Sequence, residues 1–219
     1  MSEVLLGIDA GTSAIKVCAF DRAGKLIAKA QRSVPVITPY PLWVEIDLER
    51  YWELTSEAIQ EVCARIQNAV VGVGLSTTCP TTVFLDQNNT PLRPGIVYLD
   101  GRTDELVHEV TGSDAVAYQS KTGNRASPST CWGANLLWLQ RNEPDLWARV
   151  HRVCMLNSYL ALRLTGQLGI DPTQASYSGL VDVRQPSPEW SDTLLKLWNI
   201  PKDILAPLRS SSSKLGEIT

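Results

Sequence analysis

The first part of the chain contains short, mostly apolar runs of the length of β-strands. Three such runs, separated by turn-forming residues, predict strands at 3–9, 15–21 and 26–36. The pattern then changes to helical spacing at 47–67, where Asp47 precedes the first apolar residue as an N-cap does. Strands followed by a helix are the beginning of an α/β layer.

The rest of the chain adds strands first and helices afterwards. Further strands are expected at 70–77, 81–86 and 95–100. From residue 103 onward helical spacing dominates, and it predicts helices at 104–110, 131–150, 155–166 and 189–200. We expect extended or turn-rich chain at 167–183 and a polar segment without a core of its own at 209–219. The order of elements predicts a mixed sheet flanked by helices, an α/β fold.

Composition narrows the class of protein. The chain has 219 residues, 44% of them hydrophobic and 20% charged, as in an ordinary globular protein of one large or two small domains. Its net charge of -3, without basic clusters, argues against nucleic acid as a partner. We find no signal peptide and no apolar stretch of the about 18 residues that a membrane span needs. Five scattered cysteines without a CxxC pair indicate reduced thiols, and we expect a cytoplasmic protein without a membrane partner.

The bend between the first two strands carries more polar chemistry than a turn requires. Asp9, Gly11, Thr12, Ser13 and Lys16 lie within eight residues of one another. Backbone N–H groups and hydroxyls around such a bend suit phosphate oxygens, and glycine lets the backbone approach them closely. Lysine adds a positive charge, and the carboxylate suits a hydrated divalent cation. The alternative, a hairpin turn that its polar residues merely cap, stays open at this point.

Five stretches carry a family resemblance, in the order GIDAGTSAIKVCAFD, PLWVEIDLERYWE, VVGVGLSTTCPTTVFLD, PLRPGIVYLDGRTDE and SYLALRLTGQLGIDPTQASYSGLVDV. Together they resemble the FGGY carbohydrate kinases, which belong to the superfamily of sugar kinases, heat-shock chaperones and actin. The resemblance spans nearly the whole chain. It implies the ribonuclease H-like, actin-like ATPase fold and ATP-dependent phosphorylation of a sugar hydroxyl with Mg²⁺.

The resemblance also implies roles for single residues. Asp171 aligns with the general base that takes the proton from the sugar hydroxyl. Asp9 would organise magnesium, and the phosphates would be held by Gly11, Thr12, Ser13 and Lys16.

A second group of residues is implied at the sugar. Thr77, Thr78, Asp100 and Arg102 are expected to contact it, although a surface ion pair at a strand end is an equal alternative for Arg102. Trp132 follows a turn-rich stretch, so it either faces the sugar or, as the other helical tryptophans, packs in the core.

One departure from the family pattern bears on the substrate. Cys79 and Pro80 stand where glycerol kinases carry an Arg-Glu pair and xylulokinases Met-His. Neither side chain makes a charge-assisted bond to a hydroxyl, so glycerol is disfavoured and the usual xylulose contact is missing. We expect a ketopentose, because three stretches look most like xylulokinases. A polyol, deoxysugar or signal-molecule kinase, a non-catalytic sugar- or protein-binding module, and an actin-like ATPase scaffold are the alternatives.

The second departure is length. The family carries a second domain of the same superfamily fold with the adenosine pocket. Residues 1–219 correspond to the N-terminal sugar-binding domain, with the C-terminal nucleotide-binding domain absent from this chain. We therefore expect the sugar, ATP and that missing domain as partners, and a chain that is inactive alone. Whether it forms a homodimer stays open.

Overall fold

The computed structural model describes residues 3–67 and 69–218, and the chain divides into two compact units. Unit 1 contains the chain up to Val36 together with Ile46–Thr78. Unit 2 contains Ile37–Glu45 and the chain from Cys79 onward.

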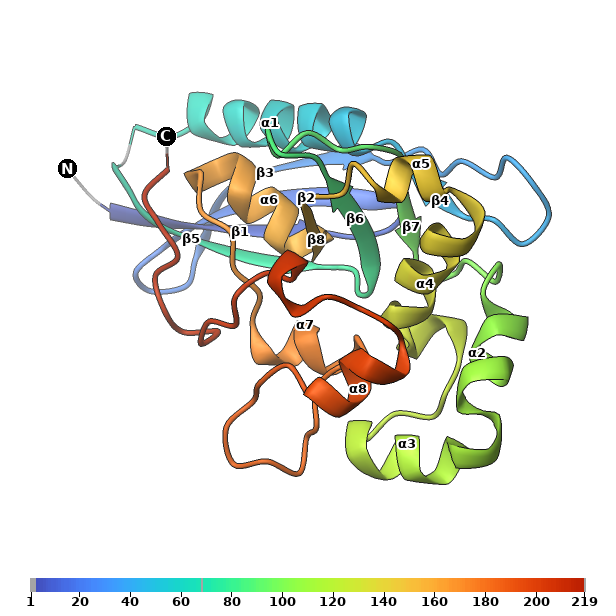
Figure 1. Ribbon diagram of the computed structural model, residues 1–219. Helices are drawn as coiled ribbons and strands as arrows, with labels where there is room; N and C mark the ends of the chain where they lie inside the picture. Colours follow the sequence, from blue (N-terminus) through green and yellow to red (C-terminus); the bar gives the residue numbers. More distant parts are fainter. Residues whose placement is uncertain (1–2, 68, 219) are drawn as a thin grey trace. The chain divides into compact units, whose positions relative to one another are not determined.

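Unit 1 is a four-stranded mixed sheet with one long helix (Figure 1). The strands lie in the order β3-β2-β1-β5, where β1 is antiparallel to β2 and parallel to β5. The helix α1 contacts β2 and β3. The elements are β1 Glu3–Ala10, β2 Ala14–Asp21, β3 Leu26–Ser33, α1 Leu48–Ala64 and β5 Ala69–Thr77.

The core of unit 1 follows from the alternation in the sequence. Val4, Leu6 and Ile8 of β1 are buried, whereas the residues between them are partly or fully exposed. Full burial of such a side chain contributes about 1.5–3 kcal/mol. Tyr51 is among the buried residues of α1, and Asp47 caps that helix by accepting a hydrogen bond from the Arg50 amide at 3.0 Å.

Unit 2 contains a second sheet of four strands in the order β4-β7-β6-β8. Its strands are β4 Glu45–Ile46, at the junction of the units, β6 Thr81–Leu85, β7 Gly95–Val97 and β8 Arg152–Met155. The central strand β6 is antiparallel to β7 and β8, and all five of its residues are buried.

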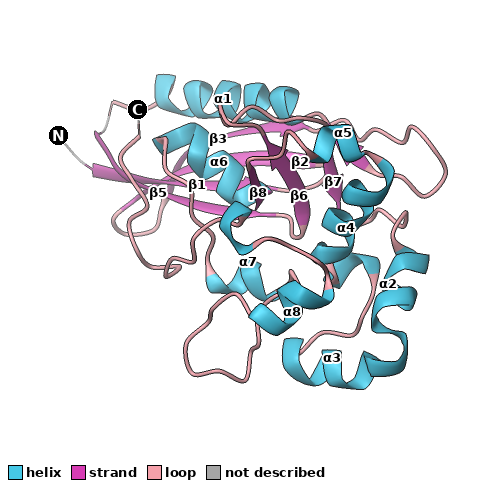
Figure 2. Cartoon of the chain, in the orientation of Figure 1, coloured by secondary structure: helices cyan, strands magenta, loops and turns pink. Residues whose placement is uncertain are grey.

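α-Helices and long loops form the remainder of unit 2 (Figure 2). The bounds of the helices are α2 Asp104–Thr111, α3 Ala115–Thr122, α4 Trp132–Asn142, α5 Pro144–Trp147, α6 Leu156–Thr165, α7 Pro172–Ser176 and α8 Asp192–Leu197. Short 3₁₀ turns lie at Gly112–Asp114, Pro128–Thr130 and Lys202–Ile204. The helix α6 packs against β6 and β8. No helix in the described ranges is long and apolar enough to cross a membrane.

The sheets differ from the sequence prediction in two respects. A mixed sheet is confirmed in unit 1, but the strands predicted at 81–86 and 95–100 belong to the separate sheet of unit 2. The partner of β6 at its other edge is β8, which the sequence pattern did not predict.

Three predicted segments need correction. The helix expected at 131–150 is two helices, because Pro144 has no amide hydrogen to donate and restricts the backbone of Glu143. The helix expected at 189–200 is confined to α8. The segment 167–183, expected to lack regular structure, contains the helix α7.

Candidate functional site

The loop between β1 and β2 is tightly closed. The Gly11 amide donates to the Ala14 carbonyl at 3.0 Å, and a Cβ at Gly11 would meet that same oxygen at 3.0 Å. The Tyr51 hydroxyl donates to the Gly11 carbonyl at 2.8 Å, and the Ser13 carbonyl accepts from the Val34 amide at 2.9 Å. The carbonyl oxygens of Gly11, Ser13 and Ala14 thus each accept a hydrogen bond from within unit 1. These bonds hold the loop in one conformation.

The end of β5 joins this loop. Parallel pairing sets Ala10 beside Thr77, so β1 and β5 end at the same edge of the sheet. The Thr78 amide donates to the Ala10 carbonyl at 2.9 Å, and the hydroxyls of Thr12 and Thr78 are 2.9 Å apart. The Thr77 hydroxyl is buried and has no hydrogen-bond partner among the described residues. The predicted phosphate and sugar residues of unit 1 are thus brought together.

Asp9 and Lys16 face each other across the hairpin. They occupy paired positions of β1 and β2, and Lys16 Nζ lies 3.5 Å from Asp9 Oδ2. Both side chains are more than half exposed, so the ion pair is weak and either partner is free to bind a ligand at little cost. Within the described residues no three His, Cys, Asp or Glu side chains form a metal cluster. One exposed carboxylate fits a hydrated Mg²⁺, which takes its other ligands from water and substrate phosphates.

Asp171 lies in unit 2 as the N-cap of α7. Its Oδ1 accepts hydrogen bonds from the Thr173 amide at 2.9 Å and the Gln174 amide at 3.1 Å. Pro172 follows at the first helical position, which suits its fixed φ and missing amide hydrogen. A third donor, Asn157 Nδ2, lies 3.1 Å from Oδ2. The carboxylate is therefore held in a defined orientation by three hydrogen bonds.

Cys79 lies close to Asp171 and makes weak sulfur contacts. Its Sγ is 3.8 Å from Met155 Sδ and 3.9 Å from the Gln174 carbonyl oxygen. Burial, and to a smaller extent the negative charge of Asp171, raises the pKa of the Cys79 thiol to about 12. The thiol is therefore neutral at physiological pH.

Asp100 and Arg102 form a buried ion pair. Arg102 donates from Nε to Asp100 Oδ1 at 2.8 Å and from Nη2 to Asp100 Oδ2 at 2.7 Å, and the Val44 amide donates to Oδ2 at 2.6 Å. The exposed fractions of the two side chains are 1% for Arg102 and 2% for Asp100. This geometry contradicts the alternative of a surface ion pair. Among the polar atoms of the pair, Arg102 Nη1 is buried without a hydrogen-bond partner in the described chain.

The pair belongs to a larger buried network. Glu45 Oε1 accepts from Arg102 Nη2 at 2.6 Å and from Arg93 Nη2 at 2.5 Å. The Arg102 guanidinium carbon lies 3.7 Å from the centroid of the Trp43 ring and 5.0 Å from that of Trp138. Charge pairing and stacking on aromatic rings together satisfy a guanidinium that has left water.

Trp132 is placed in the core of unit 2. Its side chain is 0% exposed, and its ring stacks on that of Trp190 with centroids 6.4 Å apart. A Cβ on the next residue, Gly133, would lie 2.7 Å from the Trp198 ring, which shows how tightly this region is packed. The position favours core packing over contact with a sugar.

Sequence reasoning missed two residues of these arrangements. Asn157 lies in the predicted helix 155–166, where one polar residue in an apolar run gives no sign of its partner fourteen positions away. Glu45 stands in a stretch quoted for the resemblance, but its two arginine partners come from distant positions. The available signal was the acidic residue inside the apolar run WVEI.

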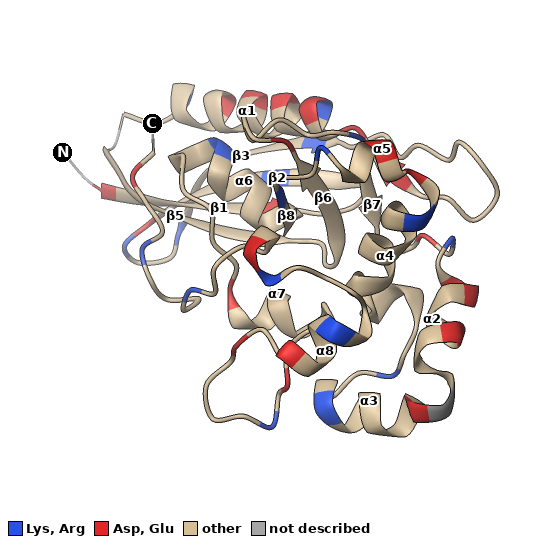
Figure 3. Cartoon of the chain, in the orientation of Figure 1, with Lys and Arg blue, Asp and Glu red and all other residues tan. Residues whose placement is uncertain are grey.

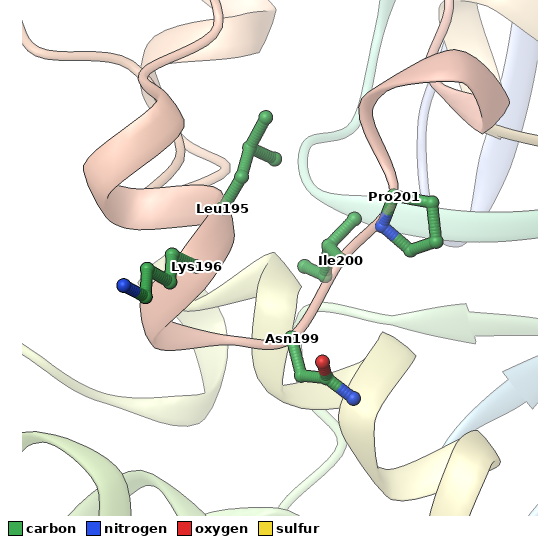
Figure 4. A pocket seen from close by; sticks show the side chains of 5 residues that line it. All are labelled: Leu195, Lys196, Asn199, Ile200 and Pro201. Atoms are coloured by element: carbon green, nitrogen blue, oxygen red, sulfur yellow. The ribbon is translucent and has the colours of Figure 1, made fainter.

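Two other surface features contain none of the predicted site residues. Figure 4 shows a pocket at the end of α8, lined by Leu195, Lys196, Asn199, Ile200 and Pro201. Lys196 is its single charged lining residue. Acidic residues gather along α1 (Figure 3), namely Glu49, Glu53, Glu57 and Glu61.

Comparison with known proteins identifies the family of the chain. The sequence model of the FGGY family of carbohydrate kinases, N-terminal domain, matches residues 4–219. The chain is 31% identical over 217 residues to the xylulose kinase of Escherichia coli (strain K12), covering 97% of this chain and 43% of that protein. It is also 31% identical over 228 residues to the glycerol kinase of Nocardia farcinica, covering 100% of this chain and 45% of that protein.

A solved structure has the same fold. The gluconate kinase of Lactobacillus acidophilus superposes with a TM-score of 0.94 at 22% identity, covering 100% of this chain and 44% of that one. The fold is that of the sugar kinases with the actin-like ATPase architecture. The chain belongs to the FGGY carbohydrate kinases as their N-terminal domain. It spans less than half the length of the relatives it matches.

Proposed function

We propose that this chain is the sugar-binding part of an ATP-dependent carbohydrate kinase and carries its general base. The observation that carries the proposal is the Asp171 carboxylate, held by three hydrogen bonds at the start of α7. Membership in the FGGY family and 31% identity to both a xylulose kinase and a glycerol kinase support the same reaction.

In the proposed reaction, Asp171 accepts the proton of the attacking sugar hydroxyl. The sugar oxygen forms a bond to the γ-phosphorus as the bond from that phosphorus to the bridging oxygen of ADP breaks. A carboxylate is a suitable base here, because the oxygen becomes more nucleophilic as its proton leaves. General-base assistance of this kind contributes a factor of about 10²–10⁴ in rate.

The loop between β1 and β2 has the phosphate-binding role. Lys16 supplies a positive charge, and the hydroxyls of Thr12 and Ser13 supply hydrogen bonds to phosphate oxygens. Gly11 has no Cβ and lets a phosphate approach the backbone closely. Asp9 would hold Mg²⁺ through its exposed carboxylate and waters. The metal, when bound, neutralises charge on the transferring phosphoryl group.

For the acceptor we propose a ketopentose. The neutral Cys79 thiol supplies no charge to a substrate hydroxyl, which disfavours recognition of glycerol by an ion-assisted bond. Thr77 and Thr78 instead supply neutral hydrogen bonds to the sugar hydroxyls. The buried Thr77 hydroxyl has no hydrogen-bond partner in the described chain. Arg102 Nη1 is the atom of the Asp100–Arg102 pair through which a sugar contact would act.

The test is an ADP-release assay on the longest polypeptide of the natural reading frame that contains residues 1–219. The panel contains ketopentoses, ketohexoses, glycerol and other polyols, each with and without Mg²⁺. We expect Mg²⁺-dependent turnover that is highest with a ketopentose. A polyol as the preferred acceptor overturns the substrate assignment, and sugar binding without ADP release from any acceptor overturns the kinase assignment in favour of a binding module.

A further inference from the structure

Asn157 faces the carboxylate of Asp171 from another helix. It lies in the first turn of α6, and its Nδ2 donates to Asp171 Oδ2 at 3.1 Å. We propose that Asn157 is a positioning residue, which fixes Oδ2 of Asp171 as the atom that accepts the substrate proton. This inference rests on the proposed function, since it takes Asp171 as the general base.

The two carboxylate oxygens of Asp171 are not equivalent. Oδ1 accepts from two backbone amides, at 2.9 and 3.1 Å, and this uses both of its lone-pair positions. Oδ2 accepts from Asn157 alone among the described residues and keeps one lone pair for a proton. The hydrogen-bond pattern therefore assigns the basic role to Oδ2.

The orientation of the Asn157 amide is set by a second contact. The Ser158 hydroxyl donates to Asn157 Oδ1 at 3.3 Å, and the Ser158 side chain is buried in unit 2. With its oxygen bound there, the amide turns its NH₂ group to Asp171. Since α6 packs against β6 and β8, the donor comes from a rigid element of the unit.

A neutral donor suits this position. A lysine or arginine at 157 would stabilise the carboxylate so strongly that it becomes a poor base. Of the other titratable groups near Asp171, Cys79 is a neutral thiol at physiological pH. Arg209 lies on the segment that pairs with Ile170, where its amide donates to the Ile170 carbonyl at 2.8 Å. An amide orients the base while costing less basicity than a cation would.

The test compares three variants of residues 1–219 by carboxylate ¹³C NMR at one fixed pH. Asn157→Leu removes the donor at similar volume, and Asn157→Ala also removes it. Asn142→Leu is the matched control, because it removes a side-chain amide that donates at 2.9 Å to the Trp138 carbonyl, in α4. Circular dichroism checks that each variant folds.

The resonance of a carboxylate carbon depends on the hydrogen bonds that the carboxylate accepts. We expect the Asp171 resonance to move in Asn157→Leu, which loses the donor at 3.1 Å, and to keep its wild-type position in Asn142→Leu. An Asp171 resonance at the wild-type position in Asn157→Leu overturns the inference. If that variant does not fold, Asn157→Ala, which also removes the donor, decides in the same way.

Turnover of the longer polypeptide with the acceptor it uses best separates this inference from the proposed function. We expect Asn157→Leu to lower kcat about 5- to 30-fold with little change in KM, since the contact orients the base and does not bind substrate. Loss of turnover in Asp171→Asn, with a wild-type Asp171 resonance and a wild-type kcat in Asn157→Leu, overturns the inference and leaves the proposed function standing. Wild-type turnover in Asp171→Asn overturns both.

Discussion

Replacing Arg102 by methionine should strongly destabilise unit 2. The substitution keeps an unbranched apolar chain near Trp43 and Trp138 but removes three side-chain hydrogen bonds to carboxylates. Asp100 and Glu45, whose side chains are 2% and 6% exposed, then stay buried with one charge partner fewer. Removing one partner of a buried ion pair lowers the free energy of unfolding by about 3–5 kcal/mol, before the remaining contacts are considered.

The partners that Asp100 and Glu45 keep narrow the expected loss of unfolding free energy. Asp100 keeps the Val44 amide and Glu45 keeps Arg93, which places the loss of charge pairing at the lower end of that range, about 3 kcal/mol. Loss of the cation stacked 3.7 Å from the Trp43 centroid adds about 1 kcal/mol. We therefore expect the free energy of unfolding to fall by about 3–4 kcal/mol.

Urea unfolding followed by tryptophan fluorescence measures this loss, because Trp43 and Trp138 contact Arg102. With a slope of about 2 kcal/mol per molar urea, the midpoint should fall by about 1.5–2 M. Arg141→Met is the control, since Arg141 makes two hydrogen bonds to Glu109 but is 47% exposed. The control should leave the midpoint nearly unchanged. Equal shifts in the two variants would refute the reasoning that burial gives the Arg102 network its strength.

Three further predictions concern the loop, the thiol and the chain as a whole. In the longer polypeptide, Lys16→Ala and Asp9→Ala should weaken the binding of ATP and Mg²⁺, so that turnover needs higher concentrations of both, while calorimetry shows unchanged sugar binding. Equal loss of sugar binding in both variants would favour a purely structural turn. The raised pKa of Cys79, about 12, leaves little thiolate at pH 8, so iodoacetamide should label Cys79 much more slowly than the exposed Cys63. Similar rates at pH 8, measured by mass spectrometry, would contradict the burial of that thiol. Residues 1–219 alone should unfold cooperatively but release no ADP, because one phosphate loop cannot supply the preorganisation that lowers a barrier by about 7–11 kcal/mol; robust turnover would contradict the proposed division of the reaction.

The fold was predictable where pattern and element agree. Short apolar runs at 3–9 and 15–21, bounded by turn-forming residues, predicted β1 and β2, and helical spacing behind Asp47 predicted α1. In contrast, β8 has only four residues and is a strand because it pairs with β6, some seventy residues earlier in the chain. Pairing of that kind depends on tertiary structure, which local patterns do not encode.

The candidate site residues remain predictions, and the structure shows only where the chain places them. Asp171 was identified through a family resemblance, and its Asp-Pro sequence is a helix-start signal that was available and that marks α7. The burial of Arg102 was not predictable, because its partner Glu45 lies 57 positions away and only the folded chain brings them together. Asn157 was missed for the same reason.

Turnover of Asp171→Asn tests the central claim most directly. In the longer polypeptide, the variant should keep the sugar affinity of the wild type, since an amide nearly preserves the shape and polarity of the side chain. Its kcat with the preferred acceptor should fall by about 10²–10⁴, the contribution of a general base. ADP release within a few-fold of the wild type, by a variant that binds sugar normally, would contradict the account.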